Sequence, residues 1–382
     1  MNEQWVHFAN EIKKMYGKDF VPLHEPTFDE TEIEYVTDCV KSGWVSSVGK
    51  YVDRFEKELA EFTGVKRAVA VVNGTAALQI AMKVAGVKAN DEVFMPALTF
   101  IATANAASYL QAIPHFVDVS RETLGLDPVK LEEHIKEIGV MKNGYLVNKI
   151  TNRIIRAVVP MHTFGHPVDL DPLVELCQRY NLALVEDAAE SLGSYYKGKH
   201  TGGFGVASAL SFNGNKIMTT GGGGAILTND DKLADYAKHI TTTAKVPHQW
   251  EYVHDEIGYN YRMPNINAAL GCAQIKKVEG FVASKRSLTT NYEKLVGKID
   301  GAELLLEPKF ATSNYWLQTI ILDPKEHRRD DLLKFLSGLG VMTRPIWTPI
   351  NTLTVYKDCP SANLIVTESL KDVILNIPSS QL

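Results

Sequence analysis

The chain has 382 residues, of which 45% are hydrophobic and 22% are charged, and its formal net charge is −5 at pH 7. This composition is typical of a globular protein long enough for two domains, and the negative balance excludes a broad basic surface for nucleic acid. The four cysteines form no CxxC pair, so neither a disulfide framework nor a metal site is expected. Apolar runs are too short to cross a membrane, and we therefore expect a cytoplasmic protein.

The first two-thirds of the chain alternates short apolar runs with amphipathic segments. Residues 26–43 predict a helix in which Thr27 and Glu30 form a capping box and Gly43 is the stop signal. Strands are predicted at 65–72, 92–96, 112–119, 153–160, 182–187, 206–212 and 223–228, with helices at 75–86, 101–110 and 169–180. This alternation predicts an α/β fold with a mostly parallel sheet and helices on both faces.

The pattern changes beyond about residue 245. Residues 244–264 are rich in aromatic side chains and lack periodicity, which predicts a long loop. Helices are predicted at 265–279, 281–298 and 330–340, and a strand at 315–322. We therefore expect a large α/β domain over residues 1–250, including an N-terminal helical segment, and a smaller α+β domain over residues 251–382.

A single lysine, Lys216, precedes four consecutive glycines in the stretch SFNGNKIMTTGGGGAI. The stretch is not a nucleotide phosphate loop, because that motif needs Gly-Lys followed by Ser or Thr. The dinucleotide fingerprint GxGxxG also fails in the preceding segment, where Ser208 stands at the position of the third glycine. These spacings disfavour an NAD-dependent enzyme.

Three short motifs follow predicted strands in chain order. NGTAAL places Gly74 and Thr75 at a helix N-terminus, which is either a plain cap or a phosphate cradle. VEDAAES places Asp187 at a strand end, as a turn residue or a site residue. Lys216 is either a solvated loop lysine or an amine that attacks an aldehyde. A phosphate anchor, an anion for a ring nitrogen and an amine are what pyridoxal 5′-phosphate requires, so the set predicts that cofactor.

Two histidines also follow a strand, in the segment HTFGHP. Their spacing would suit a metal on a helix, but Gly165 and Pro167 indicate a loop, in which His162 could face the site.

These motifs, together with PALTFIATANA and GYNYRM, resemble those of the DegT/StrS-type nucleotide-sugar aminotransferases. The resemblance runs from about residue 20 to near the C-terminus and implies the pyridoxal-phosphate-dependent aminotransferase fold of type I. Within the family the chain looks most similar to aminotransferases of legionaminic-acid and bacillosamine-type pathways. Those enzymes act on UDP-linked 4-keto-6-deoxy-N-acetyl sugars.

The resemblance also implies roles for individual residues. Lys216 would form the Schiff base and Asp187 would pair with the pyridinium nitrogen. Gly74, Thr75, Ser211 and Asn213 would hold the phosphate, Phe100 would stack on the ring, and Arg262 and Trp44 would face the substrate. Asn260 would reach the phosphate in a neighbouring subunit, which implies a homodimer with shared active sites.

Two positions depart from the family pattern. Glu190 stands where many relatives have Gln or His near the ring hydroxyl, and Asn351 stands where many have His. The roles of both residues are therefore open.

The implied reaction is transamination from L-glutamate to a nucleotide-linked keto sugar, at C4, in the biosynthesis of amino sugars and surface polysaccharides. A GDP-perosamine-type enzyme, or one acting on a dTDP-linked 3- or 4-keto sugar, is the alternative. A lyase, a racemase and a non-catalytic regulator that binds the cofactor or a sugar remain as other classes. The presence of Lys216 argues against dehydration, which an offshoot of the family performs with histidine at that position.

Overall fold

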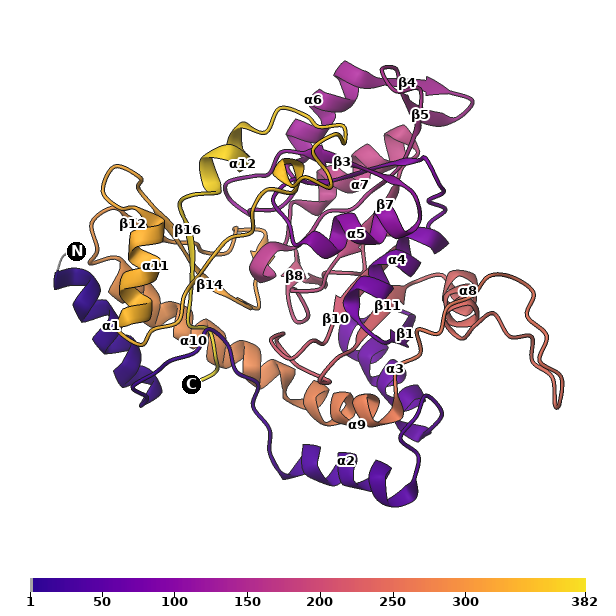
Figure 1. The fold of residues 1–382 in the computed structure, drawn as a ribbon, viewed down its shortest axis with the longest axis horizontal. Coiled ribbons are helices and arrows are strands. Elements are labelled where there is room, and N and C mark those ends of the chain that lie inside the picture. The colour runs from indigo at the N-terminus through magenta and orange to yellow at the C-terminus, as the bar shows by residue number, and fades with distance from the viewer. Residues whose placement is uncertain (1–2) are drawn as a thin grey trace.

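The predicted strands between residues 65 and 228 assemble into one large mixed sheet in the computed structural model, which describes residues 3–382 (Figure 1). Its main strands are β1 (Arg67–Val71), β2 (Glu92–Pro96), β3 (Ile113–Val117), β6 (Ile154–Val158), β7 (Ala183–Asp187), β10 (Ala207–Ser211) and β11 (Gly224–Thr228). They lie in the order β1-β11-β10-β7-β6-β2-β3, and a hairpin of β4 (Gly139–Lys142) and β5 (Tyr145–Asn148) joins β6. Each predicted strand is confirmed, with ends that differ by at most two residues.

Most neighbouring pairs among these seven main strands are parallel, whereas the β4–β5 hairpin pairs with itself and with β6 in the antiparallel sense. β10, β7, β6, β2 and β3 run in one direction, whereas β11 is antiparallel to both β10 and β1. The carboxyl ends of the parallel strands and of β1 therefore meet the start of β11 at one edge. The predicted mostly parallel sheet is confirmed, and this edge is where ligands bind in such folds.

Helices cover both faces of the sheet, as expected. The helices of this part are α2 (Glu30–Ser42), α3 (Lys50–Thr63), α4 (Gly74–Val84), α5 (Ile101–Tyr109), α6 (Pro128–Ile138), α7 (Leu170–Tyr180) and α8 (Asp231–Thr241). Side chains of α4, α5 and α8 pack on one face, where they contact Val69, Val185 and Ile226. Side chains of α3, α6 and α7 pack on the other face. Neighbouring positions of one strand, such as Val69 and Ala70, belong to opposite clusters, as strand periodicity requires.

The capping box of α2 is not the predicted one. Asp29 is the N-cap: its side chain accepts a hydrogen bond from the Thr31 amide, and the Glu32 carboxylate accepts one from the Asp29 amide at 2.8 Å. The prediction of Thr27 with Glu30 was wrong by two residues, because Asp29 and Glu32 have the same spacing and the backbone becomes helical only at Glu30. Gly43 ends the helix in the left-handed conformation, as predicted.

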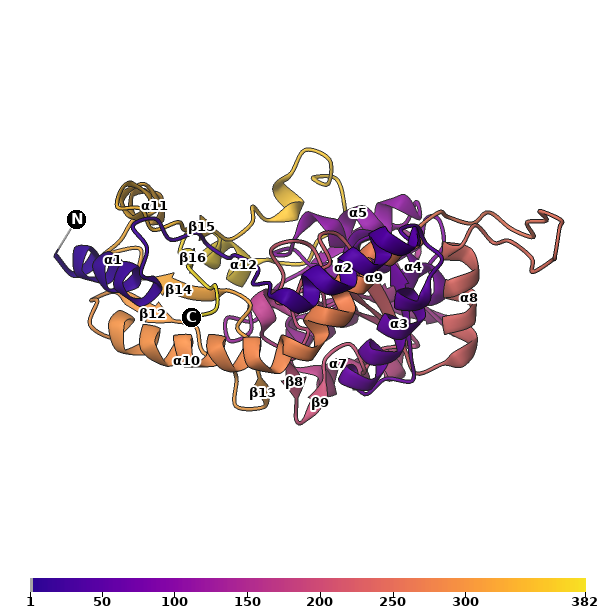
Figure 2. The ribbon, with the colours of Figure 1, turned by 90° about the horizontal axis from the view of Figure 1, so that it is seen from below.

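The C-terminal part forms a second, smaller sheet beside a long helix. Its elements are α9 (Asn265–Gln274), a short turn of 3₁₀ helix at Ile275–Lys277, α10 (Val278–Val296), β12 (Ala302–Leu304), β14 (Gln318–Leu322), α11 (Arg329–Gly338), β15 (Arg344–Pro345), α12 (Ile365–Leu370) and β16 (Ile374–Ile377). The strand order is β12-β14-β16-β15. Figure 2 shows α10 running from the small sheet toward the large one.

The predicted strand at 315–322 begins only at Gln318. The segment before it is a turn in which Tyr315 has a φ of 47°, a left-handed conformation that interrupts strand geometry.

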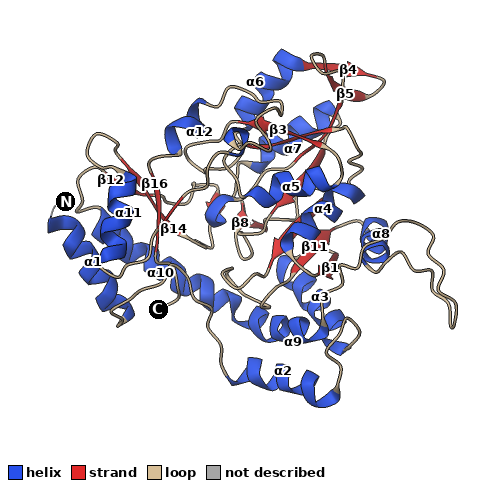
Figure 3. Cartoon of the chain, in the orientation of Figure 1, coloured by secondary structure: helices blue, strands red, loops and turns tan. Residues whose placement is uncertain are grey.

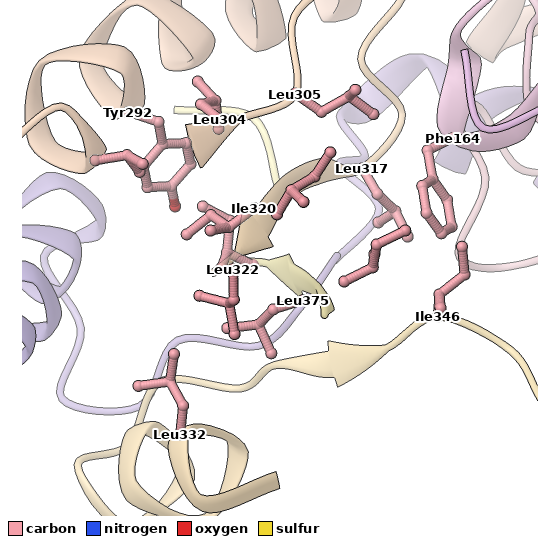
Figure 4. Close-up of a cluster of buried hydrophobic side chains, with 14 of the residues drawn as sticks. Phe164, Tyr292, Leu304, Leu305, Leu317, Ile320, Leu322, Leu332, Ile346 and Leu375 are labelled. Carbon is pink, nitrogen blue, oxygen red and sulfur yellow. The ribbon is translucent and has the colours of Figure 1, made fainter. Parts of the chain in front are cut away.

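The small sheet has its own hydrophobic core, part of which is shown in Figure 4. Ile320 and Leu322 of β14 lie there with Leu375 of β16 and Tyr292 of α10. Helix α1 (Glu3–Tyr16) completes this core with Trp5, although it is at the other end of the chain (Figure 1). The division of the chain at residue 250 stays a prediction, and α1 packs with the C-terminal elements.

Residues 243–264 contain no helix and form the predicted long loop, which projects away from the large sheet beside α8 (Figure 3). None of the helices within residues 3–382 combines the length and the apolar character needed to cross a membrane.

Candidate active site

A cavity of about 320 Å³ opens at the edge where the parallel strands end. Asp187 at the end of β7, Ser211 at the end of β10 and Phe100 after β2 line it. Gly74, Thr75, Glu190, Asn213 and Lys216 also line it, so most of the predicted site residues lie around one space. The sheet places them together because these strand ends share one edge.

Glycines shape one wall of this cavity. Gly224 pairs with both Val71 and Ser211, and a Cβ atom on Gly224 would lie 2.5 Å from the Asn73 carbonyl carbon. A Cβ atom on Gly74 would lie 2.8 Å from the Ser211 Cβ. Because Gly224, at the end of the glycine run, has no side chain, the start of α4 can approach β10 and β11 closely.

The start of α4 is arranged for an anion. The Asn73 side chain caps the helix by accepting a hydrogen bond from the Ala76 amide at 2.8 Å. The amides of the first helical residues, Gly74 and Thr75, have no partner within the helix, and the helix dipole is positive at this end. With the nearby Ser211 and Asn213 side chains, they form a cradle of donors that suits a phosphate group.

Asp187 is buried and is held by two donors. The Thr103 hydroxyl donates to Asp187 Oδ2 at 2.7 Å, and the Ala189 amide donates to Oδ1 at 3.2 Å. Burial raises the pKa of Asp187, while the hydrogen bond from Thr103 opposes that rise. A buried carboxylate at this position can pair with a protonated ring nitrogen.

Lys216 lines the same cavity, and its side chain is only 11% exposed. Its Nζ atom is 3.1 Å from Glu190 Oε1 and 4.0 Å from the centroid of the Trp316 ring. The amine therefore sits inside the cavity between a carboxylate and an indole face, and it is not a solvated loop lysine.

Glu190 is buried in the wall beside Lys216. Its second carboxylate oxygen accepts a hydrogen bond from the Phe164 amide at 2.9 Å. Burial raises the pKa of Glu190 to about 7, although the charge of Lys216 opposes the rise.

The neighbouring Glu186 has a structural role. Its carboxylate accepts hydrogen bonds from the amides of Gly202, Phe204 and Gly205. His162 Nε2 lies 3.2 Å from the same carboxylate. Burial by itself raises the pKa of Glu186, but the contact with His162 and these amides hold it below its usual range. His162 lies next to a 3₁₀ turn at the strand-end loop, as predicted, and it faces Glu186 and not the cavity.

Aromatic rings form the mouth of the cavity. Phe100 is 47% exposed, and its centroid is 6.1 Å from that of Trp347. Phe164 packs against Trp347 at 5.0 Å and is also part of the core of the small sheet (Figure 4). The mouth thus combines residues from the large sheet with residues from the C-terminal elements.

Three of the predicted site residues, Trp44, Asn260 and Arg262, do not line the cavity of their own chain. Asn260 is exposed and its Oδ1 accepts a hydrogen bond from Arg262 Nε at 3.0 Å. Trp44 is exposed and its carbonyl accepts one from the Asn265 side chain. Their substrate and partner contacts stay predictions. Asn351 has a buried Oδ1 to which the structure of residues 3–382 gives no hydrogen-bond partner.

Three residues around the site, Thr103, Trp316 and Trp347, were not singled out from the sequence. Thr103 lies in the quoted motif PALTFIATANA, one helical turn after Phe100, and this spacing could have placed it on the same side of α5. Trp316 comes from a segment far along the chain, and no local pattern connects it with Lys216. It donates a hydrogen bond from Nε1 to the Asn215 carbonyl at 2.6 Å.

Comparison with known proteins identifies the family. The model of the DegT/DnrJ/EryC1/StrS aminotransferase family matches residues 26–382. The chain belongs to this family. This finding confirms the resemblance, the fold class and the aminotransferase activity expected from the sequence motifs.

Individual members of this aminotransferase family match most of the chain. GDP-perosamine synthase of Escherichia coli O157:H7 is 38% identical over 339 residues, which cover 89% of this chain and 88% of that enzyme. GDP-perosamine synthase of Caulobacter vibrioides is 36% identical over 363 residues, covering 94% and 93% of the two chains. The solved structure of a DegT DnrJ EryC1 StrS aminotransferase from Brucella abortus has a TM-score of 0.83 and 28% identity, and covers 92% of this chain and 90% of that one.

Aminotransferases of this family use pyridoxal 5′-phosphate, and the cavity fits this cofactor. The donors at the start of α4 suit its phosphate, and the space there exists because Gly74 has no Cβ. Asp187 and Lys216, the anion and the amine that the cofactor needs, line the same cavity. No group of His, Cys, Asp and Glu side chains within residues 3–382 is arranged to hold a metal ion.

Proposed function

We propose that this enzyme transfers an amino group from L-glutamate to a nucleotide-linked keto sugar, with Lys216 and Asp187 as the residues that work on the cofactor. The observation that carries the proposal is the meeting of a buried amine, a buried carboxylate and a helix N-terminus around one cavity. When bound, pyridoxal phosphate supplies an aldehyde for amines and a ring that accepts an electron pair from the reacting carbon.

The residues of the chain have distinct tasks in this proposal. Lys216 supplies the amine that holds the cofactor and, when released, moves a proton at the reacting carbon. Asp187 keeps the ring nitrogen protonated, and Thr103 holds the Asp187 carboxylate in place. Gly74, Thr75, Ser211 and Asn213 bind the phosphate. Phe100 and Trp347 limit the access of water at the mouth.

A GDP-linked keto sugar is the acceptor that we propose first. GDP-perosamine synthases from two organisms match about nine-tenths of this chain or more at 36% to 38% identity, and their name states a GDP-linked amino sugar as the product. The sequence motifs led us to expect a UDP-linked N-acetyl sugar, and no comparison supports that nucleotide over GDP. Transfer to C4 is part of the same proposal.

The long loop supports a homodimer with shared sites. Trp250 and Ile257 in this loop are 76% and 85% exposed, which is unusual for large apolar side chains. Figure 1 shows the loop extending from the body next to α8. Asn260 and Arg262 lie where the loop returns to the large sheet: Asn260 pairs with Thr242, after α8, and Arg262 pairs with Val71 at the end of β1. We propose that a second copy of this chain covers the loop, so that Asn260 and Arg262 of each copy reach the cavity of the other.

Two measurements test the proposed function. Borohydride reduction of the yellow holoenzyme followed by peptide mapping should attach the cofactor to Lys216, and Lys216→Ala should abolish turnover. A panel of GDP-, UDP- and dTDP-linked keto sugars with glutamate should give an amino sugar with the GDP-linked substrate. Attachment at another lysine would overturn the assignment of Lys216, whereas amination of only the UDP- or dTDP-linked sugars would overturn the choice of nucleotide.

A further inference from the structure

Lys216 and Glu190 form an ion pair inside the cavity, and the roles assigned so far do not use it. The two side chains are 3.1 Å apart, and they are 11% and 1% exposed. A pair so enclosed is screened little by solvent, so each charge has a large effect on the proton equilibrium of the other.

Glu190 is held in place from several sides. The Phe164 amide donates to its Oε2, and Phe164 has a φ of 56°, a strained conformation that this contact accompanies. The Asn314 side chain donates to the Glu190 carbonyl at 2.9 Å. The carboxylate therefore faces Lys216 in a fixed orientation, and rotation away from the amine would break the bond from Phe164.

Trp316 also contacts the Lys216 amine. Its ring face lies 4.0 Å from Nζ, and its indole nitrogen is bonded to the carbonyl of Asn215, the residue before Lys216. An aromatic face attracts a cation more strongly than it attracts a neutral amine. Both contacts of the amine therefore favour its ammonium form.

The other ionisable groups nearby do not replace Glu190. Asp187 interacts with both Lys216 and Glu190, but its oxygens are bonded to Thr103 and Ala189. His24 also lies near Lys216, and its pKa is lowered by burial first and then by Lys285 and Lys216, so it is neutral. Within residues 3–382, Glu190 is the carboxylate that the structure pairs with this amine.

We propose that Glu190 is a positioning residue that stabilises the ammonium form of Lys216 and thereby makes the free amine a strong enough base for the reaction. This inference rests on the proposed role of Lys216. In the step concerned, the Lys216 amine would take a proton from the substrate carbon, and pyridoxal phosphate, when bound, would supply the group that accepts the electron pair of that C–H bond. The ammonium formed in this way is the species that Glu190 stabilises, and it returns the proton later.

Burial raises the pKa of Glu190 to about 7, and the charge of Lys216 opposes this rise. The contact with the Lys216 amine therefore favours the charged form of Glu190.

The test measures the proton equilibrium of Lys216 without turnover. Cofactor-free wild type and Glu190→Gln are treated with trace acetic anhydride between about pH 6 and 11, and acetylation of Lys216 is quantified by mass spectrometry. Gln keeps an acceptor for the Phe164 amide but removes the charge. An opposite charge in contact shifts the pKa of an ionisable group by about one to three units. The pH midpoint of Lys216 acetylation should therefore be lower by at least about one unit in Glu190→Gln than in wild type.

Two further variants serve as controls. Asp231→Asn removes the carboxylate of an exposed pair with Lys66 and should leave the Lys216 midpoint unchanged. Glu190→Asp keeps the charge at a greater distance and should give a smaller shift than Glu190→Gln in the same direction. Circular dichroism checks that each variant is folded. Should Glu190→Gln fail to fold, the Glu190→Asp shift decides the proposal.

The holoenzyme gives a second readout. The pH midpoint of the visible absorption band, which reports the nitrogen of Lys216 bonded to the cofactor, should also fall in Glu190→Gln. Lys216 midpoints in both Glu190 variants within about 0.3 unit of wild type would overturn the proposal. Because the acetylation experiment contains no cofactor, its result is separate from the borohydride mapping that tests the proposed function.

Discussion

Replacing Thr103 by valine should weaken cofactor binding in a way that depends on pH. The change removes the hydroxyl that donates to Asp187 Oδ2 at 2.7 Å and keeps the shape of the side chain. Within residues 3–382, Asp187 then retains the Ala189 amide, at 3.2 Å, as its one donor. The buried carboxylate becomes easier to protonate, and a protonated carboxyl is a poor partner for a protonated ring nitrogen.

The size of the effect follows from this hydrogen bond. A hydrogen bond to a charged group contributes about 1.5–3 kcal/mol, which corresponds to a loss of roughly 10- to 150-fold in affinity. Burial already raises the pKa of Asp187 and Thr103 opposes the rise, so the variant should raise it further. The loss of affinity should therefore be larger at pH 6 than at pH 8.

The assay is equilibrium titration of pyridoxal phosphate onto the cofactor-free protein, followed by visible absorbance at both pH values. Thr103→Ser keeps the hydroxyl and should bind within about threefold of wild type, a difference of less than 1 kcal/mol. Equal affinity of Thr103→Val and wild type at both pH values would refute the reasoning, because Asp187 would then not depend on this donor. Thermal unfolding shows whether the variant is folded.

Two further predictions concern stability. Trp5→Ala should lower the free energy of unfolding by about 3–5 kcal/mol, because Trp5 is fully buried between α1 and the C-terminal core. Trp5→Phe should lower it less, and urea unfolding measures both variants. An unchanged unfolding midpoint in Trp5→Ala would show that α1 does not support this core. His166 is buried, no hydrogen-bond partner of its ring nitrogens is found within residues 3–382, and burial lowers its pKa to about 4. The unfolded chain therefore binds a proton that the folded protein does not as pH falls from about 6.5 to 4, which destabilises the fold by up to about 1.4 kcal/mol per pH unit. His166→Phe should remove this loss of stability at low pH. If the free energy of unfolding of the variant fell with pH as steeply as that of wild type, the result would contradict this prediction.

The positions of the strands and of the main site residues follow from local sequence. The seven main strands of the large sheet are short, largely apolar runs, and such runs are recognisable without knowledge of their neighbours. The β4–β5 hairpin was not predicted, because Gly139–Lys142 is not such a run. Gly74, Asp187 and Lys216 could be assigned because each follows a strand, and strand ends in this fold share one edge. The order of these motifs along the chain predicted the cofactor, and their resemblance, together with PALTFIATANA and GYNYRM, to the motifs of a known family predicted the family.

Contacts between distant segments could not be predicted in this way. Helix α1 is amphipathic, but the sequence does not state which surface its apolar face covers, and that surface belongs to the last part of the chain. The N-cap of α2 was misplaced because Thr27 and Asp29 both suit a cap, and only the path of the backbone selects Asp29.

The environment of the lysine is likewise a tertiary property. Trp316 reaches Lys216 from a turn in which Tyr315 is left-handed, and Glu190 is fixed by a strained Phe164. Sequence alone identified the amine and the carboxyl as separate residues of the site. Only the fold brings them into contact and buries them.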